Sequence, residues 1–256
     1  MLDSRDTWSS VLGWVSIANW IIVYSPQIYE NYSLQSGEGL SILFVLAWLV
    51  GDLCNLFGAI LGGLLPTVII LALYYSVCDL ILLAQIYYYR WKRTRQLSRP
   101  LEQEPLLQTR HERPRNLPLL LRYTAALVFV VVVGVMAWWI SSVLDARPTS
   151  PPTKIRWEAQ VLGWTSAVLY LVARIPQISK NLKTHCEGLS PALFFFAIFG
   201  NVTFSLSIGA QGLTRKNLIA NSGWLAGSAL TVFLDVFVLG QVFYYRAVDR
   251  SSGRSR

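Results

Sequence analysis

The fold of this 256-residue chain is decided by the stretch Ser25-Pro26-Gln27-Ile28-Tyr29-Glu30-Asn31, because the chain carries it twice. The second copy reads Ile175-Pro176-Gln177-Ile178-Ser179-Lys180-Asn181, so that Pro-Gln-Ile-x-x-Asn recurs at an offset of 150 residues. Three further blocks recur in the same order: Glu38-Gly39-Leu40-Ser41 with Glu187-Gly188-Leu189-Ser190, Gly51-Asp52 with Gly200-Asn201, and Asp79 to Arg90 with Asp235 to Arg246. Ordered matches at a nearly constant offset indicate an internal duplication.

The composition around these motifs indicates an integral membrane protein. Mean hydropathy is +0.43 and only 14% of the residues are charged, which does not suit a surface exposed to water. A membrane-spanning helix needs about 20 largely apolar residues. Seven segments meet that requirement, near residues 10–29, 40–61, 66–89, 119–144, 158–180, 189–211 and 218–245.

The duplication divides these seven helices into two three-helix repeats, 10–89 and 158–246. The helix at 119–144 has no counterpart, and its presence gives both repeats the same orientation across the membrane. The predicted fold is therefore all-α, with two parallel repeats joined by a linker helix in a 3+1+3 order, an architecture found in transporters. A loop at 90–118 and a tail at 247–256 complete the chain.

The basic residues predict the orientation. Fourteen Lys and Arg residues fall on the side of the 90–118 loop and the C-terminal tail, and six fall on the other side. The positive-inside rule then puts the C-terminus in the cytosol and the N-terminus in a lumen or outside. This distribution explains the net charge of +8 better than a nucleic-acid partner does.

The doubled Pro-Gln motif in a seven-helix chain resembles the PQ-loop family, which includes cystinosin and the lysosomal and vacuolar cationic amino acid exporters and is related in fold to the SWEET sugar transporters. The segments most similar to the cationic amino acid branch are Gly51 to Leu56, Leu65 to Thr67, Tyr74-Tyr75, Arg174 to Gln177, Gly200-Asn201 and Trp224 to Ser228. The resemblance implies a facilitator or proton-linked exporter of Lys, Arg and His in the lysosomal or vacuolar membrane. Alternating access would carry the substrate from an acidic lumen to the cytosol.

The Pro-Gln motifs are the predicted hinges. A proline inside a helix removes one backbone hydrogen bond, so Pro26 and Pro176 predict kinks near the cytosolic helix ends. Gln27 and Gln177 can form hydrogen bonds across helices and act as a latch. The alternative is a pair of static kinks that only assist packing.

Carboxylates at membrane depth are costly and are candidate functional groups. We predict that Asp52 pairs with the cationic side chain of the substrate, since its repeat counterpart is the neutral Asn201. Asp79 and Asp235 occupy equivalent positions and predict proton coupling or gating, or else structural hydrogen bonds. The remaining predicted substrate contacts are Asn31, Trp48, Asn55, Asn181, Asn201 and Trp224.

The 90–118 loop contains Glu102-Gln103-Glu104-Pro105-Leu106-Leu107. This segment fits the acidic dileucine pattern that sorting adaptors read on cytosolic segments of lysosomal or vacuolar cargo. Glu102, Leu106 and Leu107 are therefore the predicted sorting residues, and the alternative is an ordinary solvated loop.

Other function classes fit less well. The histidines, His111 and His185, both lie in loops and the three cysteines have no metal-ligand spacing, so we predict no enzyme activity, metal or cofactor. A receptor or transceptor that senses amino acids and recruits cytosolic partners remains an alternative, as does a sugar or cystine transporter of the same fold. A buried Asp52 counts against a sugar, because sugar sites favour neutral groups.

Overall fold

The structure is a computed structural model that describes residues 4–63, 66–97, 119–143, 157–215 and 222–251. Every regular element in these ranges is a helix. The helices are α1 (Ser4–Ile22), α2 (Ser25–Leu34), α3 (Ile42–Leu61), α4 (Pro66–Leu97), α5 (Leu119–Val143), α6 (Trp157–Thr184), α7 (Pro191–Gln211) and α9 (Ser222–Ser251). Seven segments of the described chain are long and apolar enough to cross a membrane, with α1 and α2 forming one of them. This confirms the predicted all-helical membrane protein.

The first span is broken at Pro26. Helix α1 ends at Ile22, and α2 begins at Ser25 with the proline in its first turn. Carbonyl groups freed at the break are bonded locally: Ser25 Oγ donates to Ile22 O at 2.6 Å, and the Tyr74 hydroxyl donates to Ile21 O. Helix α6, by contrast, continues through Pro176. The two proline positions therefore differ, with a broken span in the first repeat and one continuous helix in the second.

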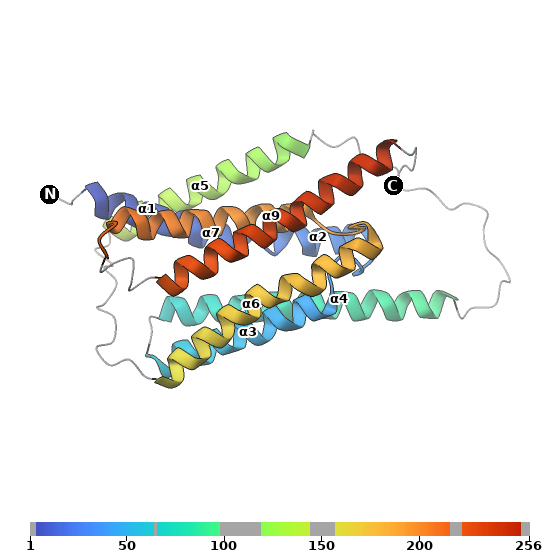
Figure 1. Cartoon of the computed structure of the whole chain (residues 1–256), viewed down its shortest axis with the longest axis horizontal. Helices are drawn as coiled ribbons and strands as arrows, with labels where there is room; N and C mark the ends of the chain where they lie inside the picture. Colours follow the sequence, from blue (N-terminus) through green and yellow to red (C-terminus); the bar gives the residue numbers. More distant parts are fainter. Residues whose placement is uncertain (1–3, 64–65, 98–118, 144–156, 216–221, 252–256) are drawn as a thin grey trace.

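Helices from the two halves of the sequence alternate in the packing. Helix α1 lies against α7, and α6 lies against α3, so the first helix of each repeat contacts the second helix of the other repeat. The third helices contact mainly their own repeat, α4 with α3 and α9 with α7 and α6. Helix α5 contacts α1 and lies on the outside of the bundle (Figure 1).

The molecule has an apolar surface and buries many polar side chains within its apolar core, unlike a water-soluble protein. Large hydrophobic side chains such as Phe129 and Trp139 on α5 and Phe233 on α9 are exposed. Polar side chains, including three aspartates and an arginine, are buried among the helices. A bilayer accounts for both features, since lipid solvates the apolar surface while buried polar groups must bond to one another.

The helix pairs meet at one end of the molecule and diverge toward the other. In Figure 1, α1 and α7 lie above α3, α4 and α6, and the two layers meet where α2 approaches the C-terminal part of α6. The loops that follow the Pro-Gln motifs, 35–41 and 185–190, lie at this closed end.

Candidate functional site

The glutamines of the two Pro-Gln motifs each bind the loop of the opposite repeat. Gln27 Nε2 donates to Gly188 O at 3.0 Å, and Gln27 Oε1 accepts from the Ser190 amide at 2.8 Å. Gln177 makes the equivalent pair of bonds, to Gly39 O at 3.1 Å and from the Ser41 amide at 2.7 Å. We call these two glutamines and the loop segments that they bind the Gln clamp.

The motif asparagines hold the clamp glutamines. Asn31 Oδ1 accepts from Gln27 at 2.8 Å, and Asn31 Nδ2 donates to Gln85 of α4 at 2.9 Å. Asn181 repeats both bonds at the same distances, with Gln177 and with Gln241 of α9. The side chains of Gln27, Asn31, Gln177 and Asn181 are all buried. The clamp is therefore a connected network in which each bond has a counterpart in the other repeat.

The ion pair at Glu38 gives the first loop an additional tie. Arg90 donates to both carboxylate oxygens of Glu38, at 2.6 and 3.0 Å, and Lys180 Nζ lies 3.7 Å from the same carboxylate. Lys180 also donates to Leu40 O at 2.8 Å. The hydrogen bond from Arg90 holds the pKa of Glu38 below its ordinary value. Because Lys180 belongs to α6 and Glu38 to the first loop, this tie also joins the two repeats.

A second polar network lies deeper between the helices, around Asp52 of α3. The Tyr170 hydroxyl of α6 donates to Asp52 Oδ1 at 2.5 Å, and the Tyr24 hydroxyl donates to Oδ2 at 3.3 Å. Asn55 Nδ2 in turn donates to the Tyr170 hydroxyl at 2.8 Å. Tyr24 stands in the break between α1 and α2. The broken helix thus carries a residue that binds the carboxylate directly.

Arg174 and Asp235 form a buried ion pair beside this network. Arg174 Nε and Nη2 donate to the two Asp235 oxygens at 2.9 and 3.2 Å, and Nη1 donates to Tyr170 O at 2.6 Å. The guanidinium carbon also lies 5.1 Å from the centre of the Trp48 ring. This arrangement satisfies a charge that would otherwise be expensive to bury.

Asp79 differs from the other two aspartates. It is fully buried on α4 near Asp52 and Tyr24, no basic side chain pairs with it, and neither of its carboxylate oxygens makes a hydrogen bond of normal geometry among the described residues. The indole N–H of Trp48 is likewise buried without a partner there. Unbonded polar groups in a buried site are uncommon and usually mark a place for a ligand or water.

We call Asp52, Asp79, Asp235, Arg174, Tyr24 and Tyr170 the carboxylate cluster. It contains three carboxylates and one guanidinium, so negative charge is in excess if all four groups are ionised. A positively charged group placed there would find two carboxyl groups, those of Asp52 and Asp79, that Arg174 does not pair with. The cluster is adjacent to the Gln clamp along α6, because Arg174 precedes Gln177 by less than one helical turn.

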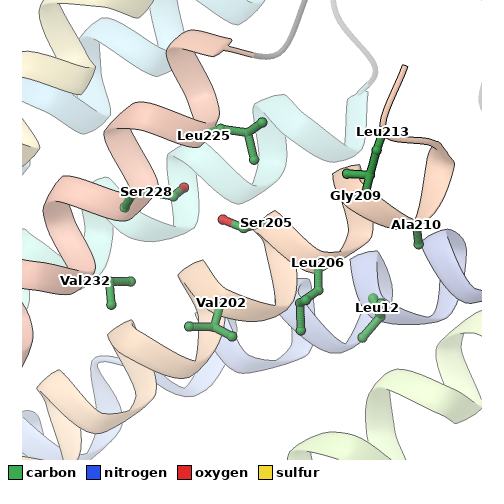
Figure 2. A pocket seen from close by; sticks show the side chains of 11 residues that line it. Leu12, Val202, Ser205, Leu206, Gly209, Ala210, Leu213, Leu225, Ser228 and Val232 are labelled. Atoms are coloured by element: carbon green, nitrogen blue, oxygen red, sulfur yellow. The ribbon is translucent and has the colours of Figure 1, made fainter. Parts of the chain in front are cut away.

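A separate pocket of about 680 Å³ lies between α1, α7 and α9 (Figure 2). Its walls are leucine, valine, alanine and glycine, with only the hydroxyls of Ser205 and Ser228 as polar side chains. None of the predicted site residues lines it. A pocket without a charged group offers nothing to bind a cation, so we do not assign it as the substrate site.

The structure divides the predicted residues between the two networks. Gln27, Gln177, Asn31 and Asn181 belong to the clamp, whereas Asp52, Asp79 and Asp235 belong to the carboxylate cluster. Trp48 and Asn55 lie beside that cluster. Asn201 is buried on α7 and donates to Ala197 O of its own helix at 3.0 Å. Trp224 is in the first turn of α9, and its side chain lies outside the described residues, as do the sorting residues Glu102, Leu106 and Leu107.

Several residues of both networks were not singled out from the sequence. Arg174 could have been found from the sequence, because a charged side chain inside an apolar span has the same high free-energy cost of burial as the aspartates. Gln85 and Gln241 recur in the duplication, yet their function as partners of the motif asparagines is visible only in the fold. Tyr24 and Tyr170 carried no comparable signal, since tyrosine is common in membrane helices.

Comparisons with known proteins point to one family of membrane proteins. The PQ loop repeat family model matches residues 8–68 and 159–214, the regions that contain both Pro-Gln motifs. The vacuolar lysine transporter of Saccharomyces cerevisiae is 37% identical over 95% of this chain and 95% of its own length. The vacuolar histidine transporter of the same yeast is 37% identical over 93% and 92%.

More distant relatives have the same kind of name. The lysosomal amino acid transporter 1 homolog of Homo sapiens is 30% identical over 98% of this chain and 87% of its own length. These relatives are transporters, and the chain is not an enzyme. With a doubled Pro-Gln clamp, seven apolar helices and full-length similarity to such proteins, the chain belongs to the PQ-loop family, in the branch that contains the yeast vacuolar lysine and histidine transporters.

Proposed function

We propose that this protein transports the cationic amino acids Lys, Arg and His across the vacuolar or lysosomal membrane. The observation that carries this proposal is the carboxylate cluster, which holds three buried aspartates and one buried guanidinium that pairs with Asp235. A substrate with a positively charged side chain would supply the missing charge. Names of the relatives, which include lysine and histidine transporters, support the same substrate class.

We propose further that the chain consists of two parallel three-helix repeats joined by α5. Helix α1 packs against α7, and α6 packs against α3 in the same way, which supports a two-fold relationship between the repeats. The matched hydrogen bonds of Gln27 and Gln177 support it independently. In such an arrangement, transport proceeds as one repeat rocks against the other around a central site.

In this mechanism the Gln clamp is the gate at one membrane face, and the breaks or bends at Pro26 and Pro176 are its hinges. The bonds between each glutamine and the opposite loop must break when that face opens. The distribution of basic residues supports a cytosolic location for the clamp and the C-terminus, with the N-terminus in the lumen. The closed clamp would then correspond to a state that is shut toward the cytosol.

Asp52 is the proposed partner of the substrate's cationic side chain. Asn55, Asn201, Trp48 and Trp224 are proposed to contact the rest of the amino acid, and the motif asparagines Asn31 and Asn181 would act through the clamp that they brace. Proton coupling is assigned to Asp79 and Asp235, of which Asp79 is better suited because Asp235 is neutralised by Arg174.

Arginine flux into proteoliposomes tests the proposal. Purified full-length protein should take up radiolabelled arginine saturably, with competition from lysine and ornithine but not from cystine, glutamate or glucose. An inward acid gradient at zero membrane potential should accelerate uptake if protons are coupled. Asp52→Asn should abolish uptake while its thermal unfolding stays within a few degrees of wild type.

Two results would change the assignment. Normal arginine uptake by Asp52→Asn would exclude charge pairing at this residue. No uptake by wild-type liposomes that contain folded protein would exclude the transporter itself and leave the receptor or transceptor as the better description.

A further inference from the structure

The two repeats treat an equivalent pair of carboxylates differently. Asp79 and Asp235 correspond at an offset of 156 residues, and both are fully buried. Asp235 is held by the guanidinium of Arg174 through two hydrogen bonds. Asp79 has no hydrogen-bond partner among the described residues. The second repeat therefore contains a complete carboxylate–guanidinium pair, and the first contains only the carboxylate.

The residue that corresponds to Arg174 is Tyr24, at the same offset of 150 that relates the two Pro-Gln motifs. Tyr24 lies beside both Asp79 and Asp52, as their electrostatic interactions show, but it donates its hydroxyl to Asp52. A neutral phenol thus stands where the other repeat has a cation. It leaves Asp79 without a counter-ion in the part of the chain that the structure describes.

The surroundings of Asp79 suit a flat or compact cation. Tyr75 lies one turn before Asp79 on α4, and its ring centre is 6.0 Å from that of Tyr24. Trp48 packs against Tyr24 with ring centres 5.4 Å apart, and its buried N–H has no partner among the described residues. Aromatic faces attract cations, and a free indole N–H can donate to a carboxylate.

We propose that the subsite beside Asp79 receives the guanidinium or ammonium group of the substrate, in the position that Arg174 fills in the second repeat. Arg174 is then a built-in occupant that blocks the second subsite and restricts cation binding to the first. Asp52 contacts the same cation from the neighbouring helix, and Tyr24 covers the subsite when it is empty. This inference rests on the proposed transport of cationic amino acids and adds the subsite, its counter-ion and the reason for a single site.

The decisive variant is Tyr24→Arg, which recreates the internal ion pair in the first repeat. Equilibrium binding of radiolabelled arginine to the purified full-length protein is the readout. We expect Tyr24→Arg to fold with a melting temperature at or above that of wild type and to lose arginine binding by about 30-fold or more, the typical cost of losing a buried charge partner. Tyr24→Gln, a neutral side chain of similar reach, removes the phenol without adding a cation and should bind arginine at least about tenfold more tightly than Tyr24→Arg does.

Asp79→Asn provides a second test that does not depend on the folding of Tyr24→Arg. It should also weaken arginine binding by about 30-fold or more. If Asp79→Asn binds arginine as wild type does, the inference is wrong, and a lost response to an acid gradient would then report only the proton coupling proposed above. Equal binding by Tyr24→Arg and Tyr24→Gln would overturn it as well. Failure of wild-type protein to bind arginine, lysine or histidine would instead refute the proposed function itself.

Discussion

The backbones of Gly39 and Gly188 touch. A Cβ atom at Gly39 would lie 1.9 Å from the carbonyl oxygen of Gly188 and 2.3 Å from its carbonyl carbon. These glycines are repeat counterparts, and each offers its carbonyl oxygen to the clamp glutamine of the other repeat. The two loops therefore meet at the point where the Gln clamp closes, and only residues without a side chain fit there.

Gly39→Ala is expected to force the loops apart, because backbone atoms cannot move away as the end of a flexible side chain can. The thiol of Cys186, which is buried in the second loop, should then react faster with a maleimide. Its labelling rate should increase by about tenfold or more, since each 1.4 kcal/mol lost from the closed loop multiplies the open population tenfold. Peptide mass spectrometry separates Cys186 from the other cysteines.

Gly163→Ala in α6 is the matched control, because a Cβ there meets no atom within 4 Å. It should leave the labelling rate of Cys186 unchanged. A Gly39→Ala protein that reacts at the wild-type rate would show that the contact between the two glycines does not hold the loops closed.

The two clamp glutamines are expected to act as one unit. Gln27→Ala or Gln177→Ala leaves buried polar partners unsatisfied and should lower the free energy of unfolding by about 1–3 kcal/mol. The double variant should lose less free energy of unfolding than the sum of the two single losses, because breaking the bonds of one glutamine already loosens those of the other. Thermal and denaturant unfolding of wild type, the two single variants and the double variant gives the coupling energy between Gln27 and Gln177. Strictly additive losses would mean that the two halves of the Gln clamp open independently.

The Arg174–Asp235 pair is expected to be costly to break from one side. Arg174→Gln leaves the Asp235 carboxylate buried without a counter-ion and should destabilise the protein by about 3–5 kcal/mol. The double variant Arg174→Gln with Asp235→Asn should recover most of that loss, because no charge is then left unpaired. Unfolding measurements on the single and double variants decide the matter, and a double variant as unstable as Arg174→Gln would contradict the ion-pair explanation.

The stability that Glu38 contributes is expected to depend on pH. Arg90 holds the pKa of Glu38 below the ordinary value of 4.5, so the contribution is complete above that value and is lost as pH falls through the lower pKa of the folded state. The pair is nearly half exposed, which limits its worth to about 1 kcal/mol or less.

The difference in melting temperature between wild type and Glu38→Gln should therefore be constant from pH 7 to about pH 5 and should shrink below about pH 4.5. In an Arg90→Gln background, Glu38→Gln should show a weaker pH dependence, because the donor that lowers the Glu38 pKa is gone. A difference that grows on acidification would have the wrong sign for a carboxylate stabilised in its ionised form.

Mutation of the dileucine segment is expected to change the subcellular localisation of the protein without changing its transport activity. Replacing Leu106 and Leu107 with alanine should redirect a fluorescent fusion away from the vacuolar or lysosomal membrane. Arginine uptake by the purified variant in proteoliposomes should equal that of wild type, since the segment lies outside the predicted spans. Unchanged localisation in cells would remove Glu102, Leu106 and Leu107 from the sorting role.

The sequence by itself determined the fold class. Apolar segments of spanning length give seven spans, because a backbone in lipid must satisfy its own hydrogen bonds, and the second and third predicted spans are the separate helices α3 and α4. It also identified the motif glutamines and asparagines and the three aspartates of the two networks, because polar groups at membrane depth are too costly to retain without a use.

Only the tertiary structure decided how these residues are joined. The sequence cannot indicate that Gln27 binds the loop after Gln177, because that pairing depends on α1 packing against α7 and α6 against α3. Nor can it show that Arg174 is the counter-ion of Asp235 while Asp79, which lies near Tyr24, has none among the described residues. Hydrogen-bond and ion-pair partners that are far apart in the sequence are brought together by helix packing. Local hydropathy pattern and composition do not specify that packing.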